Sequence, residues 1–280
     1  MRADRWAARV FLAAAVLAVA VLGGGVFFLA ERAAVFFSQV PAARFFLGEV
    51  WAPPAAYGLL PFLGGSLLVT FLALGLAFFP GLATALYITG GGKGGRLLRL
   101  GLEVLGGIPA VVLGWLALGE ILPFLGSLTG TGGFGPGAAG IILAVMVLPT
   151  FALLAIRALE KVPSVYREAA LALGAKPWTV LRGVVLPLAW EGIRSALILA
   201  ATRALGETMA VQVVVGNAPV VPAGLFVPAA TLTSWIATEM GHAPYGTPAA
   251  DSLFALGLVL LGLALVGAHL ARGKESGAGG

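Results

Sequence analysis

The stretch AAGIILAVMVLPTFALLAI, residues 138–156, carries no charged side chain and is long enough to cross a lipid bilayer as a helix. About 20 apolar residues, each adding about 1.5 Å, cover the roughly 30 Å of hydrocarbon. Lipid offers the backbone no hydrogen-bonding partner, and the stretch lacks the alternation of a barrel strand. We therefore expect a transmembrane helix here.

Further apolar runs of similar length lie on both sides of this stretch. They occupy residues 10–30, 62–86, 101–125, 193–216 and 252–270. The first run follows Arg2, Arg5 and Arg9, but its apolar core is too long for a cleaved signal peptide, so we expect an uncleaved span. The sequence predicts an all-α membrane protein with six transmembrane helices.

The composition excludes an ordinary soluble domain. The chain has 280 residues, of which 60% are apolar and 10% charged, with a mean hydropathy of +1.02. Soluble domains are about 45–50% apolar and about a quarter charged. The chain has no cysteine, which excludes disulfides and thiolate metal sites, and His242 and His269 are too few for a multi-histidine metal cage. We expect no cofactor and no metal.

Positive charge is sorted along the chain. Most of the 17 lysines and arginines lie before the first run, between the second and third, between the fourth and fifth, or after the sixth. In a protein with six spans these segments share one side, which the positive-inside rule makes cytoplasmic. The residues are Arg2, Arg5, Arg9, Lys93, Arg96, Arg99, Arg157, Lys161, Arg167, Lys176, Arg182, Arg194, Arg272 and Lys274. The opposite side has only Arg32 and Arg44, so both termini are predicted to be cytoplasmic, and nucleic acid is not an expected partner.

The segments predicted on the outer side are short. Residues 31–61 are rich in aromatic side chains and form either an interfacial stretch or a packed cap on the bundle. Residues 126–137 form a glycine-rich turn, and residues 217–251 a longer loop with a short helix expected near 230–240. The expected domains are an N-terminal helix and outer segment (1–61), a transmembrane domain (62–271) and a tail (272–280).

The glycines of GGGKGG, residues 90–95, do not predict a nucleotide site. No βαβ unit surrounds them, Gly94 follows Lys93 where a P-loop has Ser or Thr, and Tyr87 stands where the first P-loop glycine belongs. We interpret the segment as a cytoplasmic turn. The chain is therefore expected to have no ATP site of its own.

Residues 157–194 are the most polar stretch and are long for a connection between two spans. Ser164 is a candidate N-cap, and Gly174 suits the left-handed residue that ends a helix. Pro177 opens a second helix, which is expected to stop near Pro187. Such a helix pair could dock another protein. A surface connector without a partner is the alternative.

A spaced motif lies inside this segment. Its residues are Glu168, Ala169, Ala170, Gly174, Val184, Leu186 and Pro187, in the pattern EAA-x3-G-x9-V-x-L-P. The pattern resembles the EAA loop of ABC importer permeases, the binding-protein-dependent transport inner-membrane components, with Val184 in place of isoleucine. The resemblance implies a type I importer permease architecture with a cytoplasmic coupling helix. It also implies that residues 168–174 transmit movement from a separate ATPase subunit.

Two charged residues, Arg203 and Glu207, interrupt the fifth apolar run near its middle. A central ion costs about 2.5–3.5 kcal/mol on translocon scales, so both should face protein or water. Four residues apart on one helix, they should share a face and partly neutralise each other. The guanidinium suits an oxyanion such as phosphate. Glu207 could hold Arg203 in the empty pathway and accept a hydrogen bond from protonated phosphate. A pair that only locks helix packing is the alternative.

The stretch RALGETMAV, residues 203–211, followed by Gly216-Asn217, resembles the permease subunits of phosphate ABC importers. Further similarity lies in residues 107–109, 148–150 and 231–237, although the residues after Thr150 are more apolar than the family pattern. That family has two sister permeases. Met-Ala-Val at 209–211 favours one of them, because the other usually has Ala-Pro after the shared Glu-Thr.

The resemblance implies a non-enzymatic permease subunit that forms half of a phosphate pathway, with Arg203 and Glu207 taking part in passage and ATP hydrolysed by a separate subunit. The implied partners are a homologous permease, a dimer of ATPase subunits, an extracytoplasmic phosphate-binding protein and membrane lipid. Four alternatives remain: a permease for molybdate or sulfate, the sister phosphate permease, a scaffold, and a membrane enzyme using Glu207, Glu103 or His269. Against the enzyme, no second group for acid–base catalysis stands at a recognisable spacing from these residues. Against the scaffold, such a protein would not need charged residues in the middle of the membrane.

Overall fold

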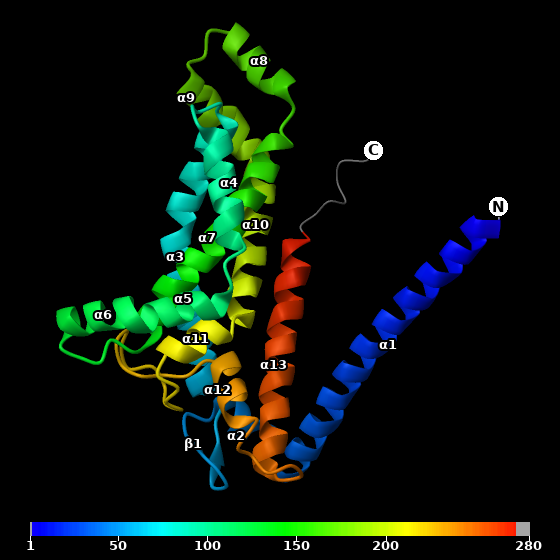
Figure 1. Cartoon of the computed structure of the whole chain (residues 1–280), viewed down its shortest axis with the longest axis vertical. Helices are drawn as coiled ribbons and strands as arrows, with labels where there is room; N and C mark the ends of the chain where they lie inside the picture. The colour runs from blue at the N-terminus through cyan, green and yellow to red at the C-terminus, as the bar shows by residue number, and fades with distance from the viewer. Residues whose placement is uncertain (1, 273–280) are drawn as a thin grey trace.

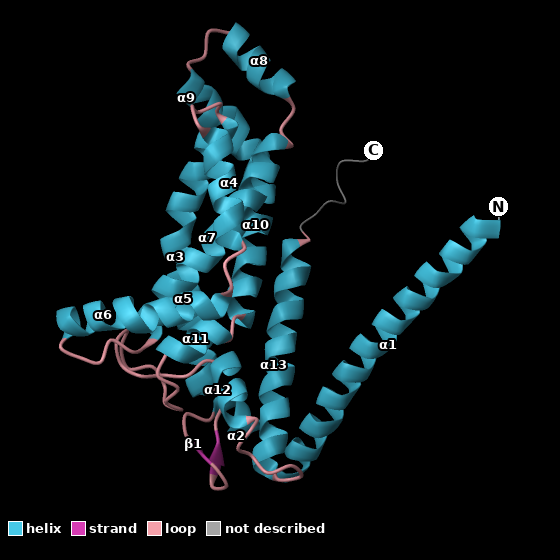
Figure 2. Cartoon of the chain, viewed as in Figure 1, coloured by secondary structure: helices cyan, strands magenta, loops and turns pink. Residues whose placement is uncertain are grey.

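The computed structural model describes residues 2–272, without the side chains of residues 2–5 and 8. Of the predicted tail 272–280, only Arg272 lies within the described residues. Figure 2 shows a molecule made almost entirely of helices. Six helical segments within the described range are long and apolar enough to span a membrane, which confirms the predicted fold class. They are Arg9–Gln39, Leu60–Thr89, Ala110–Thr129, Pro136–Glu160, Pro177–Gly206 and Pro248–Ala271.

The centre of the bundle is helix α7 (Pro136–Glu160), and two thirds of its apolar span is buried. Helix α3 (Leu60–Thr89) packs along α7, and α10 (Leu186–Gly206) also packs against it. The buried stripe of α10 consists mainly of alanines at three- and four-residue spacing. Its members are Ala189, Ile193, Ala196, Ala200 and Ala204. Small side chains let helix backbones approach closely where no hydrophobic effect drives helices together in lipid.

Helix α13 (Pro248–Ala271) lies beside α10, and α1 (Arg2–Gln39) meets the bundle only near one end of α13. Figure 1 shows α1 leaning away from the bundle over most of its length, towards its N-terminus. We call the end of the bundle where α1 meets α13 the α12 end, after helix α12 (Leu232–Glu239). The opposite end is the α8 end, after helix α8 (Ser164–Ala172). Residues 9–26 of α1 are exposed in this chain, so lipid or another chain has to cover them.

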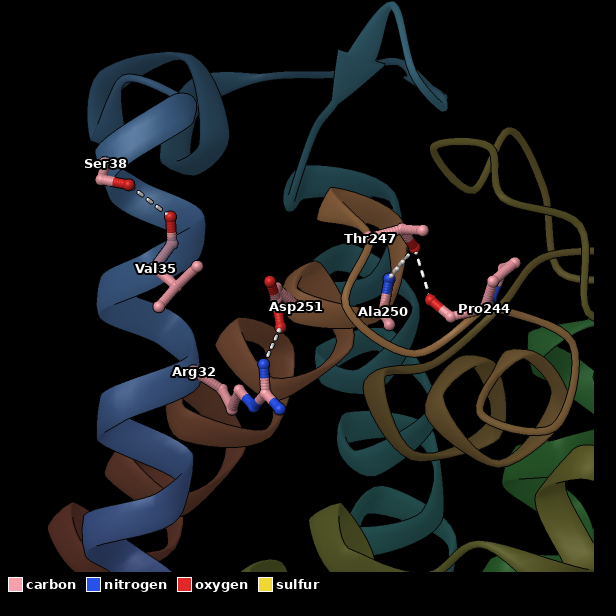
Figure 3. A network of polar contacts seen from close by, with 7 residues as sticks. All are labelled: Arg32, Val35, Ser38, Pro244, Thr247, Ala250 and Asp251. Carbon is pink, nitrogen blue, oxygen red and sulfur yellow. Dashed lines mark hydrogen bonds and ion pairs between the residues drawn. The ribbon is translucent and has the colours of Figure 1, made fainter.

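An ion pair ties α1 to α13 where they meet. Figure 3 shows Arg32 reaching from α1 to Asp251, with its Nη1 atom 3.5 Å from Asp251 Oδ1. Asp251 is only 2% exposed and lies in the first turn of α13, where the helix dipole favours a carboxylate. The guanidinium also lies 4.3 Å from the ring centroid of Tyr245. The hydroxyl of Thr247 caps the same turn by accepting from the Ala250 N–H at 3.3 Å.

A second hydrophobic cluster covers the α12 end. It includes the short helices α2 (Ala42–Leu47) and α12 (Leu232–Glu239) and the antiparallel pair β1 (Trp51–Ala52) and β2 (Ala56–Tyr57). The large buried side chains of this cluster are Phe36, Phe45, Trp51, Tyr57, Phe62 and Trp235. Of the two readings of residues 31–61, the packed cap is therefore confirmed, as is the short helix near 230–240.

The third predicted span, 101–125, is wrong in its boundaries. Helix α4 (Gly95–Gly106) runs beside α3 and α7, and after a break α5 (Ala110–Leu116), a π-helical turn (Ala117–Ile121) and α6 (Leu122–Thr129) continue in a different direction (Figure 1). The break falls at Pro109, which lacks an N–H and disfavours helical geometry in the residue before it.

A turn and an ion pair hold α4 in place. A turn in which Gly91 and Gly94 have positive φ joins α4 to α3, so the expected turn is present over residues 90–94, and Gly95 begins α4. On α4, Arg99 pairs with Glu160 at the end of α7, with Nη1 to Oε1 at 3.0 Å.

The predicted helix stop near Pro187 is also wrong. Helix α9 (Pro177–Val180) runs through a π-helical turn (Leu181–Val185) directly into α10. A proline ring clashes with the carbonyl four residues before it in an α-helix. That residue is Gly183, inside the wider π turn, which is the local adjustment that lets the helix pass Pro187.

Candidate functional site

Arg203 lies in the last turn of α10, where the helix dipole favours a cation. The residue is exposed at the surface of this chain. Its Nη1 atom donates a hydrogen bond to Oγ1 of Thr150 on α7, at 2.7 Å. Helix α10 ends part-way along α13 in Figure 1, well short of the α12 end. The guanidinium therefore lies among apolar spans, where lipid is a costly neighbour.

Glu207 does not share a helix with Arg203, so the prediction of a single helix over 193–216 is wrong. Its backbone is extended, with φ −72° and ψ 130°, and the chain turns into the short helix α11 (Met209–Val214). Glu207 Oε1 accepts from the Thr208 N–H at 3.2 Å, and its carbonyl accepts from the Thr233 hydroxyl at 2.8 Å. Among residues 2–272, no ion pair joins Arg203 to Glu207, so the predicted mutual neutralisation is wrong too.

A small polar cavity lies beside Glu207, with about 10 Å³ of room, roughly the space of one water molecule. Its lining is Ser66, Val69, Thr70, Ala204, Leu205, Glu207, Val211, Thr231 and Thr233. The hydroxyl of Ser66 accepts from the Leu232 N–H at 2.8 Å, which ties α3 to the start of α12. Arg203 and Glu207 therefore belong to two separate polar sites. Arg203 lies on an exposed face, and Glu207 lies at a cavity between α3, α10 and α12.

Sequence reasoning missed Thr150, although a signal was present. Thr150 is the only hydroxyl-bearing residue of α7, and no other polar side chain occurs before Arg157. A lone polar residue in a buried apolar helix needs a partner, and Arg203 is that partner. The hydroxyls around Glu207 were missed because Ser66, Thr231 and Thr233 come from segments far apart in sequence.

Of the predicted coupling residues, Glu168, Ala169 and Ala170 lie on α8 (Ser164–Ala172), which stands at one end of the molecule in Figure 1, and Gly174 follows the helix. Ser164 is not the N-cap, since that position is held by Pro163, and no side chain caps the helix. At the other end, Gly174 has φ +79° as expected. The N–H of Gly174 bonds to the Leu171 carbonyl, and the N–H of Ala175 to that of Ala170, which is the Schellman pattern.

Helix α8 has no buried residue. Glu168 and Ala169 are exposed, whereas Ala170 is partly buried against the hydrophobic core of the helix bundle. Large apolar side chains around them are also exposed: Val165 (68%), Tyr166 (54%), Leu173 (88%) and Trp178 (66%). Exposed apolar side chains grouped in this way are typical of a surface that another protein covers.

Comparison with known proteins gives consistent matches. Residues 79–272 match the family described as binding-protein-dependent transport system inner membrane component. The chain is 33% identical to the phosphate transport system permease protein PstC of Mesorhizobium japonicum, over 89% of this chain and 82% of that protein. It is 39% identical to the probable ABC transporter permease protein YqgH of Bacillus subtilis, over 73% of this chain and 67% of that protein.

A solved structure has a similar fold. A chain of the MetNI methionine ABC transporter, in an inward-facing conformation, superposes with a TM-score of 0.56 and 25% sequence identity. The match covers 74% of this chain and 92% of that chain.

Proposed function

The chain belongs to the family of binding-protein-dependent transport system inner membrane components, and we propose from this that it is one permease subunit of an ATP-driven phosphate importer. Members of this family are transport components rather than enzymes. The subunit forms half of the translocation pathway for inorganic phosphate and belongs with PstC rather than with its sister permease PstA.

The observation that carries this proposal is the setting of Arg203. A guanidinium on an exposed face, held by a neutral hydroxyl at 2.7 Å, keeps its full charge for an anion. Its planar fork of donors matches the oxygens of phosphate better than an ammonium would. Because lipid is costly against such a group, the face that carries it lies against a homologous permease and the aqueous pathway between the two halves.

The ATPase subunits dock at α8. The exposed residues Glu168 and Ala169, with the apolar side chains beside them, form the docking surface, and Gly174 fixes how α8 ends. The two halves then rock between outward and inward openings while ATP is bound and hydrolysed by the partner subunits. Nucleotide chemistry belongs to those partners in this proposal.

The remaining partners follow from the direction of transport. Both termini and the α8 end are cytoplasmic, and the α12 end faces the side from which phosphate arrives. The full assembly contains a PstA-like permease, two PstB-like ATPase subunits on the cytoplasmic side and an extracytoplasmic PstS-like phosphate-binding protein. The chain itself lies in the cell inner membrane. Residues 1–61 form an N-terminal unit and residues 62–271 the permease domain.

Glu207 acts in passage separately from Arg203. Its carboxylate lies at a cavity lined by hydroxyl groups and can accept a hydrogen bond from a phosphate oxygen that carries a proton. Sulfate has no such proton at neutral pH. This role favours phosphate over sulfate on chemical grounds.

Vesicles that contain the whole complex test the proposal. ATP-driven uptake of labelled phosphate is expected when the binding protein is present, and none when ATP or the binding protein is withheld. Uptake of molybdate or sulfate in place of phosphate would instead assign the chain to another oxyanion importer.

A further inference from the structure

The hydrogen bond between Arg203 and Thr150 joins two neighbouring spans, α10 and α7. Thr150 differs from five other threonines in the helices. The usual partner of a helical threonine hydroxyl here is the carbonyl four residues earlier in its own helix. Such bonds are made by Thr84, Thr89, Thr129, Thr202 and Thr238. Among residues 2–272, no bond of this kind is found for Thr150, whose oxygen accepts from Arg203 instead.

The chemical consequence concerns charge. A carboxylate partner would neutralise the guanidinium and compete with an incoming anion, as the sequence alone suggested for Glu207. A hydroxyl accepts the hydrogen bond without adding charge, and a neutral partner holds a cation less strongly than an ionised one does. Oγ1 also keeps its own proton, which is a second donor beside Nη1.

We propose that Thr150 is the positioning residue for Arg203: it holds the guanidinium on the exposed face between transport events and releases it to an oxyanion at little cost. The proposal rests on the proposed function, because it gives Arg203 an anion to bind. It explains how Arg203 is held without an ion pair to Glu207, and it assigns to α7 a part in the pathway that its apolar sequence conceals.

The first test replaces Thr150 in the complete complex in vesicles. Thr150→Val keeps the shape and removes the hydroxyl, whereas Thr150→Ser keeps the hydroxyl. The expected result for Thr150→Val is a loss of about threefold to tenfold in phosphate transported per ATP hydrolysed, the size of one net hydrogen bond. Thr150→Ser should restore the ratio to within about twofold. The matched control is Thr202→Val, one residue from Arg203, whose hydroxyl bonds within its own helix.

Two outcomes would overturn the proposal. One is an unchanged ratio in Thr150→Val. The other is an equal fall in uptake and in ATP hydrolysis that Thr150→Ser does not repair, which would make the bond a packing lock only. If the unaltered complex hydrolysed ATP but transported no phosphate, the proposed function would fail. The contact between Thr150 and Arg203 can still be tested by a measurement that needs no substrate.

That measurement is a double-mutant cycle on the purified complex. Thr150→Val and Arg203→Met each remove the same hydrogen bond, so their effects on the thermal unfolding midpoint should be clearly less than additive. Additive effects would mean that the two side chains do not interact, and would refute the positioning role whatever the substrate is.

Discussion

Gly65 on α3 lies against the carbonyl group of Ala230, so closely that a Cβ atom at position 65 would collide with that oxygen. The contact sets the distance between α3 and the segment that leads into α12. It also places Ser66 to accept the Leu232 N–H, and so shapes the cavity beside Glu207.

Gly65→Ala is therefore expected to destabilise the permease, since overpacking a well-packed site costs about 1–3 kcal/mol. The measurement is the thermal unfolding midpoint of the purified complex. Gly75→Ala in the same helix is the matched control, because nothing lies within 4 Å of the Cβ it would add. Equal midpoints for the two variants would show that the Gly65 contact relaxes without cost.

Arg203→Ala should abolish phosphate uptake, because it removes the cation that we propose for the pathway. Arg203→Lys should leave about a tenth of the uptake or less, since an ammonium cannot offer the planar fork of donors. Labelled phosphate uptake in vesicles measures both. The complex should still assemble and dock its ATPase subunits. Normal uptake by the alanine variant would remove Arg203 from the pathway.

Gly174→Val should uncouple ATP hydrolysis from transport. The cost comes from the backbone rather than from a steric clash, because φ is +79° and no atom lies within 4 Å of the added Cβ. A β-branched residue strongly disfavours that conformation, at about 1–2 kcal/mol or more. Two measurements check this. One is the ATPase activity stimulated by the loaded binding protein, and the other is the amount of ATPase subunit that stays bound to the purified complex. Gly183→Val offers a control at a glycine without positive φ.

Asp251→Asn should loosen the attachment of α1. Removing the charge from one partner of a largely buried ion pair is expected to cost about 2 kcal/mol. Since the chain has no cysteine, spin labels can be attached to α1 and α13 through Val16→Cys and Leu265→Cys. The distribution of distances between the two labels should be broader when Asp251→Asn is added. The exposed carboxylate of Glu49 provides the control variant Glu49→Gln. An unchanged distribution in Asp251→Asn would contradict the role of the pair.

Burial raises the pKa of Tyr57 above its ordinary value of 10.0. The folded cap therefore disfavours the ionised phenol. The contribution of this group to stability is complete below pH 10 and is lost as pH rises through the raised pKa. Tyr57→Phe should lose less stability than the unaltered protein between neutral pH and pH 11 in thermal unfolding. A parallel loss in both would place the alkaline sensitivity elsewhere.

Physical patterns in the sequence predict the spans well where helices are long and uniformly apolar. Residues 138–156 lie inside α7, and residues 252–270 lie inside α13. Gly174 was predicted correctly because a helix end with positive φ leaves a local signature. The cap over residues 31–61 was left open between two readings, because burial against α12 depends on chain segments far away in sequence.

Predictions failed where tertiary structure or lipid changes what a local signal means. Pro187 normally stops a helix, but a π turn accommodates it here. Hydropathy does not register the break at residues 207–208, since apolar residues continue on both sides. The relation between Arg203 and Glu207 was inferred from helical spacing alone, and that spacing loses its meaning once Glu207 is extended. The role of Thr150 could have been suspected from its place as the lone polar residue before Arg157 in an apolar helix, but its partner could not.

The exposed guanidinium on α10 also has a consequence for the life of the newly made protein. Until the homologous permease that we propose as its partner covers that face, the bilayer must accommodate an ion, at a cost of about 2.5–3.5 kcal/mol on translocon scales. A subunit synthesised without its companion should therefore be short-lived and readily degraded. The side chain that we propose for phosphate passage is then also the one expected to mark the unpaired subunit for degradation.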